Sequence, residues 1–578
     1  MDASMCTMPY VLHIGSHVRT TSAINTFTPS FDEEISLSKE TEERPLFLRK
    51  ATGLVRAWSS FDAFLYAFFS VNIVTLGLYG YSFGPFWPSS NLVPAIAIST
   101  FLIIFLVITY AMLISAMPRA GGDYVWQTRI LGGFVGFVAS INGWVTCLWL
   151  WGPIYGNMVQ VQIVAPLLAT LGYVDAALWW TTANGIFLGT LITAVFVSVV
   201  VGLGMRWYAR VQKICFYVAL LGLASFMVVL ALGSQASFRA AFDSFVQTTF
   251  GYANAYSDTT ALAVSEGYAH TPFEVSLVDF YAAGALIPLV AFYNLWPNWG
   301  ATLYGEVKGA VDFKRNMWQM MWANILGGVG GIAVLLLTFS TFGYEFFQTS
   351  NYAYWMQLYG GSAPPLPIYP YTPFLAGLVF NNPLLTVWLI ISMSFWFWGW
   401  AGTLFLSSTR AMFAMAFDRT LPAWVGQVST RFKAPVNTIA VMFVATMFLG
   451  TLYSYVPGVA VIFLDAVLAI AAMYFITCIA AMVFPYRRKK LFEASPIAKY
   501  KIGGVPAITV AGAITAAYLL YLLVKWAMDP AYGVNNPISA MYLGATYIGS
   551  AVLYLAMKAY RKGQGIDINK IYGEIPSE

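Results

Sequence analysis

Apolar runs of about twenty residues recur along the chain and leave few folds open to it. A helix of roughly 20 apolar residues crosses the hydrocarbon of a bilayer. Twelve such runs are expected near 59–81, 94–117, 133–164, 179–204, 211–233, 281–305, 317–343, 383–414, 437–456, 458–484, 506–526 and 538–558. Only 10% of the residues are charged, against roughly 25% in soluble domains. The sequence therefore predicts an all-α polytopic membrane protein with twelve transmembrane helices.

The basic residues predict how these spans are oriented. If residues 1–50 lie on the inner side, only Arg239 and Lys525 of the 30 lysines and arginines fall in outer segments. Cytoplasmic loops of membrane proteins carry such an excess of positive charge. We therefore expect a multi-pass protein of the cell membrane with cytoplasmic N- and C-terminal segments. This distribution also accounts for the net charge of +5, so no nucleic-acid partner is expected. The longest outer loops are expected at 234–279 and 344–380.

Residues that serve enzymes and metal sites are sparse in the predicted spans. Cysteines 6, 147, 215 and 478 have no CxxC spacing, which argues against a zinc site. All three histidines lie outside the spans, and no phosphate-binding P-loop motif is present. We therefore expect no catalytic residues, no metal, and no cofactor other than a coupling ion such as Na⁺ or H⁺.

The sixth run is interrupted at mid-length. Leu286 begins an apolar helix that meets the aromatic, amide and proline run from Phe292 to Asn298, after which a second half-helix extends to Lys308. An unpaired backbone group in hydrocarbon costs several kcal/mol, so such a break survives only inside protein or beside a cavity. Broken helices of this kind form substrate and ion sites in secondary transporters. A proline kink in a structural helix is the alternative interpretation.

Four stretches carry a family resemblance. They are Pro118-Arg119-Ala120-Gly121-Gly122-Asp123-Tyr124 with Arg129 and Gly132 beyond it, Gly143-Trp144, Gly305-Glu306-Val307-Lys308, and the run from Ser408 to Pro422 with Arg410 and Asp418. In this order and spacing, over about residues 50–485, they resemble the motifs of the amino acid–polyamine–organocation (APC) permease superfamily.

The resemblance implies a LeuT-like fold, a 5+5 inverted repeat in which helices 1 and 6 are broken and meet at a central site. The implied divisions are a cytosolic tail (1–50), a transport core (51–485), peripheral helices 11 and 12 (486–558) and a cytosolic tail (559–578). By this resemblance the gating aromatic residue is Phe292. The other implied substrate-binding residues are Tyr293, Asn294, Trp296 and Asn298.

The first span departs from the family pattern. Members carry a glycine-rich run there, but the matching positions in this chain are Ala67, Phe69, Ile73 and Thr75. Three polar residues, Ser70, Asn72 and Thr75, stand in an otherwise apolar stretch. We expect their side chains to take part in substrate binding in place of bare backbone, or the first helix to unwind less.

Two residues are candidates for ion coupling. The span-5 lysine of some proton-coupled members corresponds to Ala219, so that mechanism is absent. Thr403 occupies a span-8 position whose hydroxyl serves sodium in related transporters, and oxygen ligands suit a hard cation. Asp465 is an acid within the tenth span, where a carboxyl is costly unless it is paired or protonated. It is a candidate proton carrier.

The predicted function is that of a secondary permease that moves amino acids or related amines across the cell membrane by alternating access. Its expected partners are a small-molecule substrate and the lipid bilayer. An ion-independent exchanger of another organic solute or polyamine is the alternative. A channel would need rings of polar or charged groups around a pore, and the sequence contains no such pattern.

Overall fold

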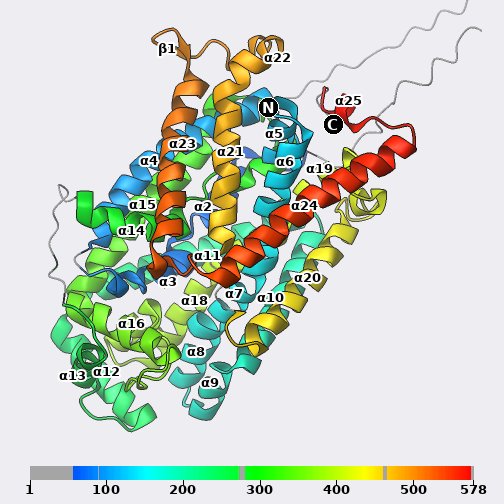
Figure 1. Cartoon of the computed structure of the whole chain (residues 1–578). Helices are drawn as coiled ribbons and strands as arrows, with labels where there is room; N and C mark the ends of the chain where they lie inside the picture. Colours follow the sequence, from blue (N-terminus) through cyan, green and yellow to red (C-terminus); the bar gives the residue numbers. More distant parts are fainter. Residues whose placement is uncertain are drawn as a thin grey trace, which may run out of the picture. The chain divides into compact units, whose positions relative to one another are not determined.

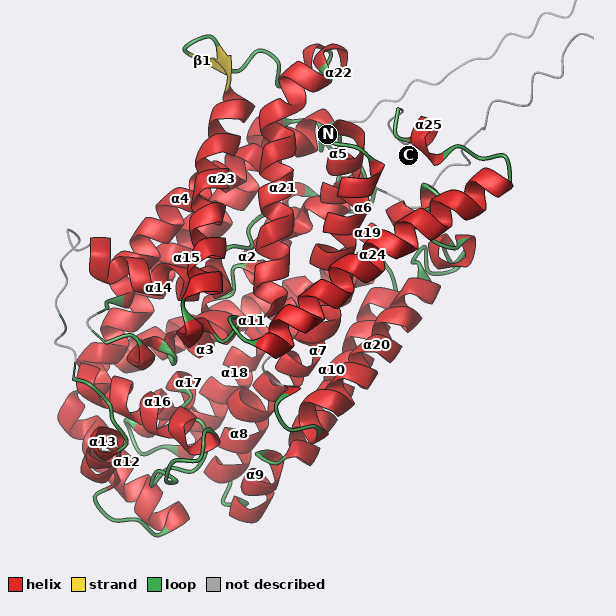
Figure 2. Cartoon of the chain, viewed as in Figure 1, coloured by secondary structure: helices red, strands yellow, loops and turns green. Residues whose placement is uncertain are grey.

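The computed structural model describes residues 56–573 apart from 89, 271–272, 274–279, 460–461 and 463–464. The predicted cytosolic tail at 1–50 lies outside the described residues. The described residues are mostly helical, and a short antiparallel hairpin is formed by β1 (Lys501–Ile502) and β2 (Val505–Pro506), in which Lys501 pairs with Pro506. Figure 2 shows these helices, drawn in red, running alongside one another.

Eleven helical stretches of the described chain are long and apolar enough to cross a membrane. They run over Ser60–Tyr81, Leu92–Ala116, Gly133–Thr170, Ala183–Gly202, Met205–Leu232, Phe313–Phe342, Pro383–Phe417, Val436–Tyr455, Asp465–Arg487, Ala507–Met528 and Pro537–Gly563. Three of these stretches are made of several helices, and we number them as in the predicted set of twelve. The first consists of α2 (Ser60–Ser70), η1 (Ile73–Gly77) and α3 (Leu78–Tyr81), and the third runs from α6 (Gly133–Ile141) to α8 (Ala165–Thr170). The eighth consists of α18 (Pro383–Ala401) and α19 (Thr403–Phe417). The ends fall close to the predicted runs.

The remaining predicted run, 281–305, is divided as its sequence indicates. α14 (Phe280–Asn294) is followed by four non-helical residues and then by the 3-10 helix η5 (Trp299–Glu306). Pro297 lies in this interruption and has no backbone N–H to continue a helical ladder. Leu295, Trp296, Pro297 and Asn298 are all buried, so the break lies inside protein.

The first span is also interrupted, at Val71 and Asn72. The cause is the Asn72 side chain: its Oδ1 accepts a hydrogen bond from the Thr75 amide at 2.8 Å, and its Nδ2 donates to the Trp396 carbonyl at 3.0 Å. Asparagine readily caps helix starts in this way. The amide of Asn72 thus starts the π-helix η1 without any glycine.

The two expected outer loops contain helices that the sequence did not predict. They are α12 (Gln235–Phe250), α13 (Ala255–Ser265), α16 (Tyr344–Leu358) and α17 (Thr372–Leu378), which Figure 1 shows, where labelled, gathered with α9 (Val174–Trp180) at one end of the bundle. We call this the cap end. Stacked rings stabilise the cap, with centroids of Tyr256 and Phe346 4.2 Å apart. Such ring pairs can order a segment that lacks a long apolar run.

The acids of the cap make local contacts. Glu266 accepts a hydrogen bond from the Ser362 amide at 3.0 Å, and this bond lowers the pKa of the Glu266 carboxyl. Glu345 lies 2.7 Å from Nδ1 of His270. The cap is therefore bound together by its own side chains. Glu274 and Asp279, which fall in the first of the two expected loops, lie outside the described residues.

The opposite end of the bundle, which we call the basic end, carries α5 (Asp123–Ile130), α22 (Lys489–Glu493), the β1–β2 hairpin and α25 (Ile568–Ile571) (Figure 1). Two buried ion pairs connect distant segments there. Arg129 binds Asp418 with both guanidinium nitrogens, and Nε of Arg410 lies 2.8 Å from Glu306. A third pair, Lys213 with Asp62 at 2.8 Å, is partly exposed.

Candidate functional site

The interruptions of the first and sixth spans lie side by side. α14 packs against both η1 and α3, and the rings of Tyr81 and Tyr293 meet edge to face with centroids 5.3 Å apart. Their hydroxyls converge on Gly331, where an added Cβ would lie 2.6 Å from the Tyr81 oxygen and 3.1 Å from that of Tyr293. The pairing of two broken helices, expected from the sequence, is therefore present.

Each interruption leaves backbone groups without helical partners. The amides of Asn72, Ile73 and Val74 donate to no carbonyl of the preceding turn, because the helical ladder stops at Val71. In the sixth span, the carbonyls of Tyr293 and the two residues after it accept from no amide of the following turn. Amides at a helix start attract negative charge, and carbonyls at a helix end attract positive charge. The two breaks together can hold a zwitterion.

Aromatic side chains surround the break in the sixth span. The Trp151 ring of α7 (Cys147–Met158) lies 6.0 Å from Phe292, 5.6 Å from Trp296 and 5.8 Å from Trp299, centroid to centroid. Among the described residues, Nε1 of Trp151 and both side-chain amide atoms of Asn298 are buried without a hydrogen-bond partner of normal geometry. Buried polar atoms are nearly always bonded, so these atoms are available to a bound solute.

Not all of the predicted substrate-binding residues lie beside the break in the sixth span. Asn298 and the rings of Phe292 and Trp296 lie beside this break, as described above. Asn294 instead exchanges hydrogen bonds with Ser99 of α4 (Leu92–Ala116), which also contacts the Tyr518 hydroxyl. Its amide is therefore occupied between helices.

In the first span, the predicted polar residues have mainly structural bonds. The Ser70 hydroxyl donates to the Tyr66 carbonyl one turn earlier, at 2.7 Å. Asn72 holds the break open, as described above. Thr75 is buried, and its carbonyl accepts from Nε2 of Gln162 at 2.9 Å. These residues shape the backbone at the break.

The two candidate coupling residues lie in different places. The Thr403 hydroxyl is 3.4 Å from the Tyr155 hydroxyl, and its carbonyl accepts from the Trp299 indole at 3.3 Å. Thr403 thus adjoins the sixth-span break. Asp465 begins α21 (Asp465–Arg487), where it is fully buried and faces Ser539 and Tyr542 of α24 (Pro537–Gly563).

At the basic end, backbone hydrogen bonds connect the first span to the sixth. Trp58 pairs with Val307 in a parallel bridge: its amide donates to the Glu306 carbonyl at 3.1 Å, and its carbonyl accepts from the Lys308 amide at 3.0 Å. The Trp58 indole donates to the Met205 carbonyl at 3.1 Å. At the basic end, the first and sixth spans are therefore joined to each other and to the start of α11 (Met205–Leu232).

The turn before α5 fits closely against η5. Gly122 has φ +40°, and an added Cβ would lie 2.8 Å from the Ala301 carbonyl group, while the Gly121 amide donates to the Thr302 carbonyl at 2.9 Å. Only a residue without Cβ allows that approach. The paired glycines of the motif thus hold η5, the second half of the sixth span.

The sequence did not single out Asp123 as a functional residue. It is fully buried, and its carboxylate accepts from the Tyr110 hydroxyl at 2.6 Å, the Thr477 hydroxyl at 2.7 Å and the Trp144 indole at 3.0 Å. Burial raises the pKa of the Asp123 carboxyl, although these hydrogen bonds act in the opposite direction. Asp123 lies outside the apolar runs, so only its place beside the glycine pair could have signalled it.

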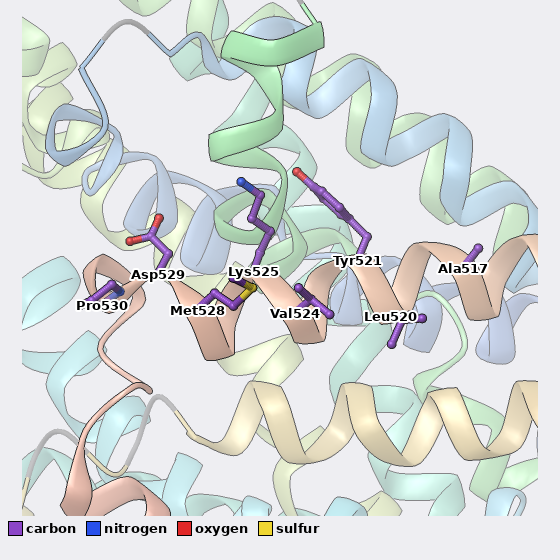
Figure 3. Close-up of a pocket in the computed structure, with 8 residues that line it drawn as sticks. All are labelled: Ala517, Leu520, Tyr521, Val524, Lys525, Met528, Asp529 and Pro530. Carbon is purple, nitrogen blue, oxygen red and sulfur yellow. The ribbon is translucent and has the colours of Figure 1, made fainter.

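At the cap end, rings cover the breaks. Phe83 stacks on Trp355 of α16 at 4.3 Å between centroids, and Tyr79 meets the same tryptophan edge to face at 5.5 Å. A cavity of about 660 Å³ lies elsewhere, along α23 (Ala507–Met528), and Figure 3 shows Tyr521 and Lys525 extending from one side of that helix. No predicted site residue lines it.

The membrane-length helices, the two adjacent breaks and the unpaired groups between them are features of a transporter rather than of an enzyme. The family model described as amino acid permease matches residues 59–551. The chain therefore belongs to the amino acid permease family, a member of the APC superfamily. No curated protein matches it significantly.

Proposed function

We propose that this protein is a secondary active transporter that moves amino acids, or amines related to them, across the cell membrane by alternating access. The observation that carries the proposal is the pair of interrupted helices, which pack against each other on both sides of their breaks. Amides of Asn72 to Val74 suit a carboxylate, and the carbonyls from Tyr293 to Leu295 suit an ammonium group. A free α-amino acid carries both charges a short distance apart.

The side chains around the break suit the side chain of the proposed substrate. Phe292, Trp296 and Trp151 offer apolar and π surfaces to a side chain, and rings of this kind also attract cationic groups. The buried Asn298 amide, which lies beside the Tyr474 hydroxyl, supplies a further donor and acceptor. This lining favours substrates with an apolar or amine-bearing side chain.

Alternating access is proposed from the two closures. In the described arrangement the Trp58–Val307 bridge covers the basic end, and Phe83, Tyr79 and Trp355 cover the cap end. A LeuT-like cycle would open the basic end, beside this bridge, and the cap end in turn, with the basic end in the cytoplasm. Sodium at Thr403 and a proton at Asp465 are the coupling alternatives that the sequence offers.

Transport by purified protein in liposomes tests the proposal. Labelled amino acids and polyamines would be supplied singly, with and without sodium and with imposed pH gradients. We expect saturable uptake that unlabelled substrate competes away. Conductance without saturation would indicate a channel, and no uptake or binding of any amino acid or amine would refute the proposal.

A further inference from the structure

Three buried carboxyls at the basic end differ in their partners. Glu306 is bound to Arg410 and Asp418 to Arg129. Asp123 is equally buried, but its hydrogen bonds come from neutral groups alone. A permanently charged buried carboxylate is normally balanced by a cation. Asp123 is therefore the one of these three suited to exist in both charged and neutral forms.

The groups around Asp123 come from five elements, one of which is η3 (Asn142–Thr146), the element that carries Trp144. The titratable ones that face it are Tyr110 of α4 and Tyr474 and Cys478 of α21. α6 presents no ionisable side chain. Arg410 of α19 and Asp418, which directly follows that helix, are each engaged in the ion pairs described above. Within the described residues, no cation is bonded to the Asp123 carboxyl.

The three donors can serve both forms of the carboxyl. Oδ1 accepts from the Tyr110 and Thr477 hydroxyls, and Oδ2 accepts from the Trp144 indole. A hydroxyl can reverse and accept a hydrogen bond, whereas an indole N–H only donates. A proton can therefore reside on Oδ1, facing a hydroxyl, while a proton directed at the indole would break the Trp144 bond.

Asp123 also contacts the machinery of the proposed site. The Trp144 ring lies edge-on to Trp299, at the start of η5, with centroids 4.9 Å apart. On the other side, Asp123 follows directly after Gly121 and Gly122, which hold the backbone of Ala301 and Thr302. A change in the bonds of Asp123 thus reaches η5, the second half of the sixth span, by two routes.

We infer that Asp123 binds the coupling proton of this permease, and that gaining or losing it changes how Trp144 and the Gly121–Gly122 turn hold η5. The inference rests on the proposed transport function. The proton binds reversibly to a carboxylate oxygen and is released on the other side of the membrane with the substrate. Asp465, the other buried candidate, faces α24 rather than η5.

The test compares Asp123→Asn with Asp465→Asn in liposomes, each assayed for substrate exchange and for accumulation driven by an inward proton gradient. We expect Asp123→Asn to keep exchange and to lose gradient-driven accumulation by about tenfold, corresponding to about 1.4 kcal/mol of lost driving force. We expect Asp465→Asn to retain both. Normal accumulation by Asp123→Asn, or loss confined to Asp465→Asn, would overturn the inference.

Tyr110→Phe tests the inference if Asp123→Asn fails to fold. It removes one donor to the charged carboxylate, so the midpoint of the pH–transport profile should move about one unit to higher pH. Tyr518→Phe is the matched control, because its buried hydroxyl bonds to Ser99 and to no carboxylate. An unmoved midpoint in Tyr110→Phe would refute the inference. Exchange by the parent protein with no response to a proton gradient would also refute it while leaving the transport function intact.

Discussion

At the scale of single residues, Phe292 is the predicted gating residue. Its ring contacts Trp151 and lies 6.3 Å from Tyr79, between the sixth-span break and the aromatic cover of the cap end. A side chain in that position can retain a solute at the break by contact alone. The contacts are with rings on two other helices, so they depend on the closed arrangement.

Phe292→Ala should therefore weaken substrate retention. We expect KM for uptake to rise about tenfold, which corresponds to about 1.4 kcal/mol of lost binding. Phe292→Tyr keeps the ring and serves as the control, for which KM should stay near that of the parent. Equal KM and kcat in Phe292→Ala and the parent would remove Phe292 from the gate.

The buried pair of Glu306 and Arg410 provides a second test at this scale. Glu306→Gln leaves the fully buried Arg410 guanidinium without its counter-charge, which typically costs about 3 kcal/mol or more. The measurement is the midpoint of thermal unfolding in detergent. Lys489→Gln is the control, since its pair with Glu493 is exposed and such pairs contribute about 1 kcal/mol or less. Equal midpoints for the two variants would contradict this account.

Residue partners were the least predictable part of the site. Arg129 and Asp418 stand 289 positions apart, and Arg410 and Glu306 stand 104 apart. Each belongs to a motif that the sequence revealed, but nothing in the spacing of the motifs states which charges meet. Asp123 was not predicted because it is buried by the packing of α5. The sequence of α5 is not an apolar run, so it does not indicate that this helix is buried.

At the scale of elements, length and hydropathy predicted most of the spans. The interruption of the sixth span was also predictable, because Pro297 and its neighbours interrupt an apolar helix. The interruption of the first span was not, because the glycines that usually signal it are absent. One amide side chain, that of Asn72, produces the same backbone geometry. The cap helices were missed because their order comes from ring packing between segments distant in sequence.

The contact between the α5 turn and η5 gives a prediction at this scale. Gly122→Ala would place a Cβ 2.8 Å from the Ala301 backbone at a φ of +40°, and overpacking of this kind costs about 1–3 kcal/mol. The unfolding midpoint and the transport rate should both fall. Gly202→Ala is the control, because no atom lies within 4 Å of its added Cβ. If the two variants unfold at the same midpoint, the close approach has no energetic importance.

At the scale of the whole molecule, the distribution of charge predicts which end faces the cytoplasm. A cysteine at the exposed position 490, in the basic end, should react with a membrane-impermeant maleimide only after cells are permeabilised. A cysteine at the exposed position 247, in the cap, should react in intact cells. Background is low among described residues, since Cys147, Cys215 and Cys478 are buried. The reverse pattern of labelling would invert the proposed orientation.

The bridge between Trp58 and Val307 determines how the basic end can open. Two backbone hydrogen bonds join the segments that flank α2 and η5 at this end, and we expect these two segments to move as one body. An exit there must open along the border of this body with α11, where the Trp58 indole bonds Met205 and Asp62 pairs with Lys213. Labels on residues 57 and 308 would then keep their separation throughout the cycle, while each moved away from a label on residue 206.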